Sequence, residues 1–247
     1  MRLEVDAGNT FVKWRVLNEY GVIQDRGLIG KGEVVEEVFS SLSSLSQIKE
    51  VLIASVSNPE LARSVSNIFS AQNASVRVYK AKTEKKMCGV EFIYTDVNRL
   101  GVDRSLAMVA AYDRYPGGVL VIDCGSAMTA DLVLATGRHV GGYIFPGFSL
   151  LKQSLLSGTY KVIVKAEVEQ NYKLGTNTEE CVDNGGHMMM RSTLHGLIEL
   201  AAGYDISDVL LTGGDGLKAK ALIGEGCEYD KDLVFKGLGM VSPYSLD

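Results

Sequence analysis

The sequence predicts an α/β protein with two similar domains, each built from a mixed sheet flanked by helices. Segments of alternating polarity, which favour strands, are interspersed with segments whose apolar residues recur at helical spacing. A Pro-Gly-Gly break at residues 116–118 interrupts the chain, and the same pattern of strands begins again after it. The length of 247 residues suits two domains. We therefore predict one domain over residues 1–116 and a second over residues 117–247.

The sequence pattern of the first half predicts three short strands followed by alternating helices and strands. The opening strands are separated by turns at Gly8-Asn9 and at residues 19–21, where glycine favours a change of direction. Asn58 is a suitable N-cap for a helix, and Pro59 is a suitable first helical residue. The predicted order is strands at 2–6, 10–17 and 21–29, a helix within 32–42, a strand at 50–56, a helix at 58–69, a strand at 75–79 and helical structure within 96–115.

The second half repeats this opening pattern. Residues 6–30 align with residues 123–147 without a gap, and they share the aspartate, the glycine two positions later, a Val-Leu pair and the final glycine. The identities are few, but the restart of three strands after the break supports two domains built on one plan. The predicted order is strands at 119–125, 127–135 and 138–145, then helices, of which one has Thr178 as a suitable N-cap, and a last strand at 208–214.

Composition narrows the classes of function. A net charge of −5 argues against a surface that binds nucleic acid mainly through phosphates. The four cysteines are far apart and include no Cys-x-x-Cys, so disulfide and zinc frameworks are not expected and a reducing compartment fits best. No run approaches about 18 apolar residues, and no basic start precedes an apolar stretch, so neither a membrane span nor a signal peptide is expected. We expect a cytoplasmic protein.

An Asp-x-Gly turn ends the first strand of each half, at Asp6 and at Asp123. A glycine in such a hairpin lets backbone N–H groups approach phosphate oxygens without a Cβ between them. Lys13 adds a positive charge for a polyphosphate, whereas the two aspartates would repel phosphate and make sense as ligands of a bridging cation. The further candidates for phosphate binding are Gly8, Asn9, Thr10, Ser126 and Thr129. If the two turns face each other across a cleft, they form a site for a nucleoside triphosphate.

A single Asp-x-Gly motif is more often an ordinary turn whose aspartate is hydrogen-bonded within that turn. Two copies in register in matched halves favour the binding site instead. The rival phosphate motifs are missing from the sequence, which has no Gly-x-x-x-x-Gly-Lys-Ser/Thr and no His-Arg-Asp loop. The segment "GLGMVS" at residues 237–242 lacks the third glycine of Gly-x-Gly-x-x-Gly.

Six motifs follow one another across nearly the whole chain. In order they are "DAGNTFVK" (6–13), "GVDR" (101–104), "DCGSAMT" (123–129), "GGYIFPG" (141–147), "GTNTEECVDNG" (175–185) and "TGG" (212–214). The arrangement resembles the actin, hexokinase and Hsp70 ATPase superfamily, and within it the motifs and their order resemble the type III pantothenate kinases. Ser126-Ala127 departs from the Thr-Ala that this family usually has, which keeps a hydroxyl for phosphate but loses the methyl that restricts its rotamer.

The resemblance implies two actin-like (ribonuclease H-like) domains with the active site in the cleft between them. It implies transfer of the γ-phosphoryl group of ATP to the primary hydroxyl of pantothenate, the first step towards coenzyme A. Asp103 would act as the base; a helix N-terminus lowers a carboxylate's pKa, so it would orient the hydroxyl first and accept the proton late. Arg104 would pair with the pantothenate carboxylate. The other expected substrate contacts are Tyr94, Gly101, Val102 and Thr178.

The resemblance also implies cations and an assembly. Mg²⁺ would accompany ATP and contact Asp6 through water, and Asp123 would bind a monovalent cation, K⁺ or NH₄⁺. Gly213 and Gly214 would let the nucleoside lie against backbone. The chain would form a homodimer with the pantothenate site near the subunit interface, where Thr178 could reach the partner's site.

Two other functions stay open at this level. A kinase of another small hydroxylated substrate, such as a sugar, would belong to the same superfamily, although sugar kinases are generally longer. A non-catalytic regulatory or accessory factor could use an actin-like fold, but it would have no physical reason to keep Asp6, Lys13, Asp103 and Arg104 together.

Overall fold

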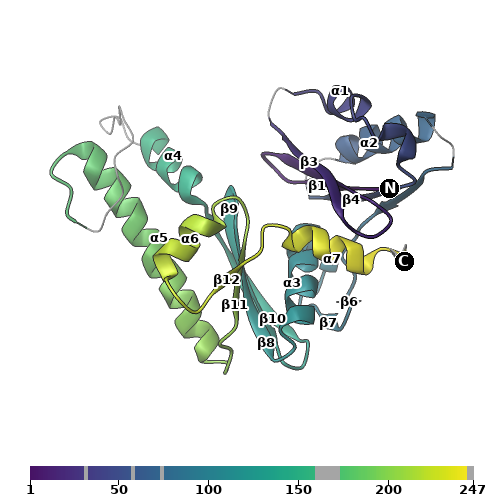
Figure 1. The fold of residues 1–247 in the computed structure, drawn as a ribbon. Helices are drawn as coiled ribbons and strands as arrows, with labels where there is room; N and C mark the ends of the chain where they lie inside the picture. Colours follow the sequence, from purple (N-terminus) through teal and green to yellow (C-terminus); the bar gives the residue numbers. More distant parts are fainter. Residues whose placement is uncertain (31–32, 57–58, 73–74, 159–172, 244–247) are drawn as a thin grey trace. The chain divides into compact units, whose positions relative to one another are not determined.

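The computed structural model describes residues 1–30, 33–56, 59–72, 75–158 and 173–243, and the elements and contacts reported below lie within them. The chain divides into two compact units. The first comprises Met1–Asp113 and Asp232–Asp247, and the second comprises Arg114–Lys231 (Figure 1).

The first unit is built on a five-stranded mixed sheet in the order β3-β2-β1-β4-β5. The first three strands form an antiparallel meander, and the last two continue from β1 in parallel. The strands are β1 (Arg2–Ala7), β2 (Val12–Leu17), β3 (Ile23–Ile29), β4 (Glu50–Ser55) and β5 (Arg77–Lys80).

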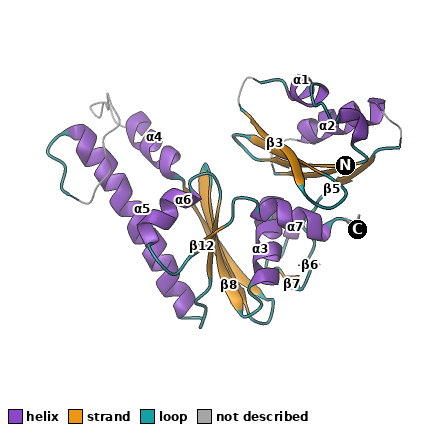
Figure 2. Cartoon of the chain, viewed as in Figure 1, coloured by secondary structure: helices purple, strands orange, loops and turns teal. Residues whose placement is uncertain are grey.

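One face of this sheet carries the apolar core of the first unit. Side chains alternate along a strand, so Leu3 and Val5 of β1 point to the same face. There they belong to one buried cluster with Phe39 of α1 (Val35–Ser40) and Phe69 of α2 (Pro59–Gln72). Figure 2 shows these two helices together beside the sheet. A short 3₁₀ turn, η1 (Leu45–Gln47), leads into β4.

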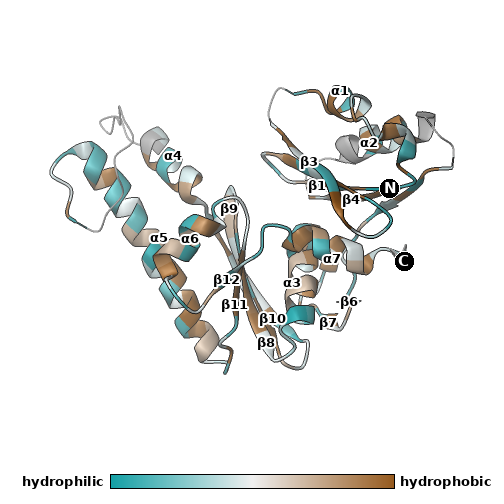
Figure 3. Cartoon of the chain, in the orientation of Figure 1, coloured by the Kyte–Doolittle hydropathy of each residue, from teal (hydrophilic) through white to brown (hydrophobic). Residues whose placement is uncertain are grey.

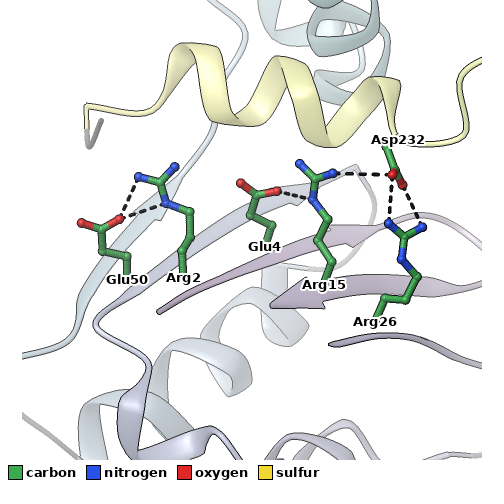
Figure 4. A network of polar contacts seen from close by, with 6 residues as sticks. All are labelled: Arg2, Glu4, Arg15, Arg26, Glu50 and Asp232. Carbon is green, nitrogen blue, oxygen red and sulfur yellow. Dashed lines mark hydrogen bonds and ion pairs between the residues drawn. The ribbon is translucent and has the colours of Figure 1, made fainter. Parts of the chain in front are cut away.

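The opposite face of the sheet carries charged side chains that helix α7 (Leu233–Val241) covers. Glu4 is only 1% exposed, and its Oε2 accepts a hydrogen bond from Arg15 Nε at 2.6 Å. Asp232, directly before α7, accepts from Arg26 Nη2 at 2.9 Å and lies 3.7 Å from Arg15 Nη1 (Figure 4). The guanidinium of Arg15 also lies over the ring of Phe235, 4.8 Å from its centroid. These contacts anchor the returning C-terminal segment to β2 and β3.

Burial of Glu4 raises the pKa of its carboxyl, and the neighbouring Arg15 charge opposes that rise. A second ion pair on the same face joins Arg2 to Glu50, with Nη2 2.8 Å from Oε2. The face therefore combines burial with charge pairing, as buried charges require.

The remaining elements of the first unit precede the boundary. They are the hairpin of β6 (Lys86–Met87) and β7 (Val90–Glu91), the 3₁₀ turn η2 (Val97–Arg99) and helix α3 (Val102–Arg114), whose last residue lies in the second unit. Helix α7 packs closely on α3 at Gly237. A Cβ at that position would collide with the carbonyl oxygen of Leu106.

The second unit repeats the sheet plan, in the order β10-β9-β8-β11-β12. Its core lies where Leu120 and Ile122 of β8 meet Met190, Leu194 and Leu197 of α5. Figure 3 shows hydrophilic and hydrophobic residues alternating along α5. The elements are β8 (Gly118–Cys124), β9 (Ala127–Leu134), β10 (His139–Pro146), α4 (Phe148–Gly158), α5 (Thr178–Ala202), β11 (Val209–Thr212), α6 (Gly216–Ile223) and β12 (Glu228–Tyr229).

The shared strand order confirms the predicted repeat of three antiparallel strands at the start of each half. The chain also has a strand after residues 208–214, β12, that the pattern did not indicate. The predicted N-cap at Asn58 lies outside the described residues. The N-cap of α5 is Asn177 rather than Thr178, since Asn177 Oδ1 accepts from the Glu180 amide at 2.9 Å.

The domain limits differ from the predicted ones at the C-terminus. The units divide between residues 113 and 114, close to the predicted 116/117. Residues 232–247, however, join the first unit rather than the second. The reason is that α7 packs on β1 and β4, and that Asp232, directly before it, meets Arg15 of β2 and Arg26 of β3.

Candidate functional site

The first Asp-x-Gly motif forms a tight hairpin at the end of β1. Asp6 is 8% exposed and stands opposite Lys13 in the β1–β2 register. The Gly8 amide donates to the Phe11 carbonyl at 3.1 Å, which closes the turn over Asn9 and Thr10. A Cβ on Gly8 would lie 3.3 Å from that same carbonyl oxygen, so the glycine suits the close turn.

Asp103 lies in the first turn of α3, next to the same end of the sheet. Its Oδ1 accepts from the Arg104 amide at 2.8 Å, which fixes the orientation of the carboxylate. A Cβ on Gly101 would lie 2.5 Å from that Oδ1 and 3.6 Å from the side chain of Val56. The Val56 amide in turn donates to the Ala7 carbonyl at 3.3 Å. The structure thus brings the 101–104 segment beside the end of β1 that carries Asp6.

Arg104 and Tyr94, both predicted from the sequence, are in contact. Arg104 Nη1 donates to the Tyr94 hydroxyl oxygen at 3.0 Å, and its Cζ lies 5.8 Å from the ring centroid. Arg104 is 8% exposed, so its charge is largely withdrawn from water. Lys85 Nζ donates to the Tyr94 carbonyl at 3.1 Å and ties that residue to the preceding segment.

The second Asp-x-Gly motif is at the equivalent end of the second sheet. Asp123 pairs in register with Thr129 of β9 and with Thr212 of β11. Gly213 has φ +86°, which favours glycine, and a Cβ there would collide with the Asp123 carboxylate and lie 2.5 Å from the Cys124 carbonyl oxygen. The residue after Asp123, Cys124, is buried, which raises the pKa of its thiol to about 12.

The other glycines of the motifs complete this second group. The Gly147 amide donates to the Ser126 carbonyl at 3.0 Å, and a Cβ on Gly147 would collide with the Gly125 carbonyl oxygen. A Cβ on Gly214 would meet nothing within 4 Å, so its backbone borders open space. Within the second unit, therefore, the segments at 123–129, 141–147 and 212–214 converge at one end of the sheet.

Thr178 is the first residue of α5 and is exposed. The helix start around it is held by Glu180, whose Oε2 accepts from the Thr176 amide at 2.8 Å and from its hydroxyl at 3.0 Å. These bonds from Thr176 lower the pKa of Glu180.

Carboxylate oxygens are the donors that hard cations prefer, so Asp6 and Asp123 fit Mg²⁺ and K⁺ or NH₄⁺ by their chemistry. Asp123 is held against Gly213 in a cradle that a Cβ would fill. Among the described residues, no group of three or more His, Cys, Asp and Glu side chains is placed to hold a metal ion. A search of the described helices for an apolar stretch long enough to cross a bilayer finds none.

Sequence motifs did not single out Thr83, Ser105 or Lys85, which contact the same region of the first unit. Their partners include backbone carbonyls, so no fixed spacing of residue types marks them in the sequence.

Comparisons with known proteins agree with these motifs. The family model described as type III pantothenate kinase matches residues 2–200. A type III pantothenate kinase of Pseudomonas fluorescens (strain Pf0-1) is 34% identical, with 99% of this chain and 100% of the relative covered. The enzyme of that name from Azotobacter vinelandii is 33% identical, with 98% and 99% covered.

The fold is shared with a solved Campylobacter jejuni structure described as a Baf family transcriptional activator. Its TM-score is 0.56 at 19% identity, and the match covers 96% of this chain and 94% of that one. This likeness concerns the fold alone, and the sequence matches go further. The chain belongs to the type III pantothenate kinase family.

Proposed function

We propose that this protein transfers the γ-phosphoryl group of ATP to the primary hydroxyl of pantothenate and so forms 4′-phosphopantothenate, the first step of coenzyme A synthesis. The family match over residues 2–200 carries this proposal. Within the first unit, the "GVDR" segment lies beside the end of β1 that carries Asp6, and phosphoryl transfer requires such closeness between the groups involved.

The phosphates of ATP bind to the two Asp-x-Gly loops. In the first, the Gly8 amide closes the turn onto the Phe11 carbonyl, and the following amides of Asn9 and Thr10, with the ammonium of Lys13, offer donors to phosphate oxygens. In the second, Ser126 and Thr129 supply hydroxyls, and exposed Gly214, which follows buried Gly213, offers its backbone to the nucleoside.

The acceptor hydroxyl is oriented by Asp103. Because its Oδ1 is fixed by the Arg104 amide in the first turn of a helix, the negative charge of the carboxylate is stabilised there. A stabilised carboxylate is a weak base, so Asp103 holds the hydroxyl in line with the γ-phosphorus and takes its proton late in the transfer.

The pantothenate carboxylate binds at Arg104 and Tyr94. The Tyr94 hydroxyl oxygen accepts from Arg104, and a phenol hydroxyl is chemically suited to donate to a carboxylate oxygen as well. Arg104 adds a charge that is only 8% exposed, and a poorly solvated guanidinium attracts a carboxylate more strongly than one in open water. Gly101 and Val102 form the backbone beside this contact.

Cations belong to the same proposal. Asp6 holds Mg²⁺ through water, and Asp123 holds K⁺ or NH₄⁺; the ions neutralise phosphate charge that Lys13 alone does not offset. We also place the enzyme in the cytoplasm as a homodimer, with the pantothenate site near the subunit interface and Thr178 contributing to it.

Purified protein, pantothenate, ATP and Mg²⁺, with and without K⁺, test the activity by release of ADP and by detection of phosphorylated product. We expect turnover with pantothenate and none with a panel of sugars. Asp103→Asn should abolish transfer while the fold stays intact, and near-normal turnover would refute the role of this carboxylate. Arg104→Ala should raise KM for pantothenate far more than KM for ATP; equal effects would count against its pairing with the carboxylate.

A further inference from the structure

Two hydroxyl groups outside the family motifs bracket the turn that presents Asp103 and Arg104. Thr83 lies between β5 and β6 and is half-buried, and Ser105 lies in the first turns of α3 and is fully buried. Their Oγ1 and Oγ atoms are 3.1 Å apart.

Each hydroxyl is bonded to a backbone carbonyl on one side of Gly101. Thr83 Oγ1 donates to the Leu100 carbonyl at 3.1 Å, and Ser105 Oγ donates to the Val102 carbonyl at 2.8 Å. Together they hold the Leu100–Gly101 and Val102–Asp103 peptide groups, one directly before the glycine and one directly before Asp103.

The backbone at Gly101 needs to be held in place by its neighbours. A larger residue does not fit there, since a Cβ would lie 2.5 Å from Asp103 Oδ1. A glycine has the largest range of backbone conformations, so the segment that orients Asp103 starts from the most flexible residue available. Hydrogen bonds from Thr83, which is outside the helix, and from Ser105, inside it, remove this freedom.

We propose that Thr83 and Ser105 are positioning residues for phosphoryl transfer, which fix the 100–102 backbone and through it the carboxylate of Asp103. This inference rests on the proposed function. Neither residue needs to touch substrate. Their effect is on the alignment of the acceptor hydroxyl, because a misplacement of about 1 Å can slow a reaction roughly 100-fold.

The decisive variants are Thr83→Val, which keeps the shape and loses the hydroxyl, and Thr83→Ser, which keeps the hydroxyl and loses the methyl. We expect Thr83→Val to lower kcat about 10- to 100-fold while KM for ATP changes less than about twofold. Thr83→Ser should restore most of the rate. Ser105→Ala should act in the same direction, less strongly, because the bond from Thr83 to Leu100 remains.

Ser41→Ala is the matched control, since Ser41 Oγ donates to the Val38 carbonyl at 2.8 Å with the same spacing as Ser105 and Val102. It should leave kcat unchanged. Hydrogen exchange of the Arg104 and Ser105 amides gives a readout that needs no turnover. Both amides should exchange faster in Thr83→Val than in the wild type and in Ser41→Ala.

The two proposals can fail separately. A wild-type protein that does not phosphorylate pantothenate would refute the proposed function, and amide exchange would still decide whether the hydroxyl pair fixes the turn. Unchanged exchange in Thr83→Val would overturn the positioning inference. So would faster exchange combined with normal kcat, or a Thr83→Ser variant as slow as Thr83→Val.

Discussion

Replacing Arg15 with methionine tests whether ion pairing stabilises the buried charged side chains between the first sheet and α7. Arg15 Nε lies 2.6 Å from Glu4 Oε2, and Glu4 is 1% exposed, so the substitution removes the cation that is hydrogen-bonded to a buried carboxylate and leaves only the weaker influence of Arg2. Unit charges about 4 Å apart attract by about 4 kcal/mol at an effective dielectric constant of about 20. Breaking one partner of a buried pair costs about 3–5 kcal/mol, so we expect Arg15→Met to lower the free energy of unfolding by that amount.

The assay is urea unfolding followed by tryptophan fluorescence. Trp14 is the only tryptophan in the sequence, and it lies in β2 of the first unit, so its signal reports on this unit. The double variant Glu4→Gln with Arg15→Met should be more stable than Arg15→Met alone by about 2 kcal/mol, since no unpaired charge remains. Arg77→Met is the control: Arg77 pairs with Glu50 but its side chain is 58% exposed, so the cost should be about 0–1 kcal/mol.

The pH dependence of the free energy of unfolding tests the same pairing independently. Burial raises the pKa of Glu4, so the folded state binds a proton more readily than the unfolded state does. The burial cost of the charged carboxylate is therefore absent below its ordinary pKa of 4.5 and develops as pH rises above it. The deficit of Arg15→Met should accordingly shrink as pH falls from about 7 towards about 5. A loss below about 1 kcal/mol at neutral pH, or a double variant no better than Arg15→Met, would refute the reasoning.

Three further outcomes are expected in the second unit. Gly213→Ala should weaken ATP binding about tenfold or more in calorimetric titration, because φ is +86° and a Cβ would collide with Asp123; unchanged binding would count against the cradle. Cys124, whose pKa is raised to about 12 by burial, should be alkylated at about pH 8 far more slowly than exposed Cys181, as peptide mass spectrometry can measure; equal rates would contradict its burial. Glu180→Gln should remove stability that the ionised carboxylate adds above its ordinary pKa and that is lost as pH falls below it; parallel thermal-unfolding profiles of variant and wild type would contradict this.

The strand pattern was predictable because alternation has a direct physical meaning. Leu3 and Val5 alternate with Arg2 and Glu4, which indicates a strand with one apolar face. The same pattern suggests that the polar face meets water. It is buried instead, because Arg15 pairs with Glu4 beneath α7. Pairing between distant residues leaves no local signal, and this is why the return of residues 232–247 to the first unit was not foreseen.

The candidate site was predictable where its chemistry follows fixed spacings. The 101–104 segment lies beside the end of β1 that carries Asp6, and Tyr94 meets Arg104, while the roles of these residues stay predictions. Thr83 was missed because its partners are a carbonyl and one hydroxyl. The N-cap of α5 could have been identified, because Asn-x-x-Glu at residues 177–180 has the form of a capping box.

The discontinuous first unit has a consequence for synthesis on the ribosome. Its sheet is encoded early, but Asp232 and α7, which cover the charged face, are translated only after the whole second unit. Until then the sheet face that carries Glu4 and Arg15 is not covered by α7. Leu106 of α3 likewise lacks its contact with Gly237 of α7. The second unit is encoded as one uninterrupted stretch, so it can complete its fold before the first unit does. The first unit is completed only when the C-terminal segment has been synthesised.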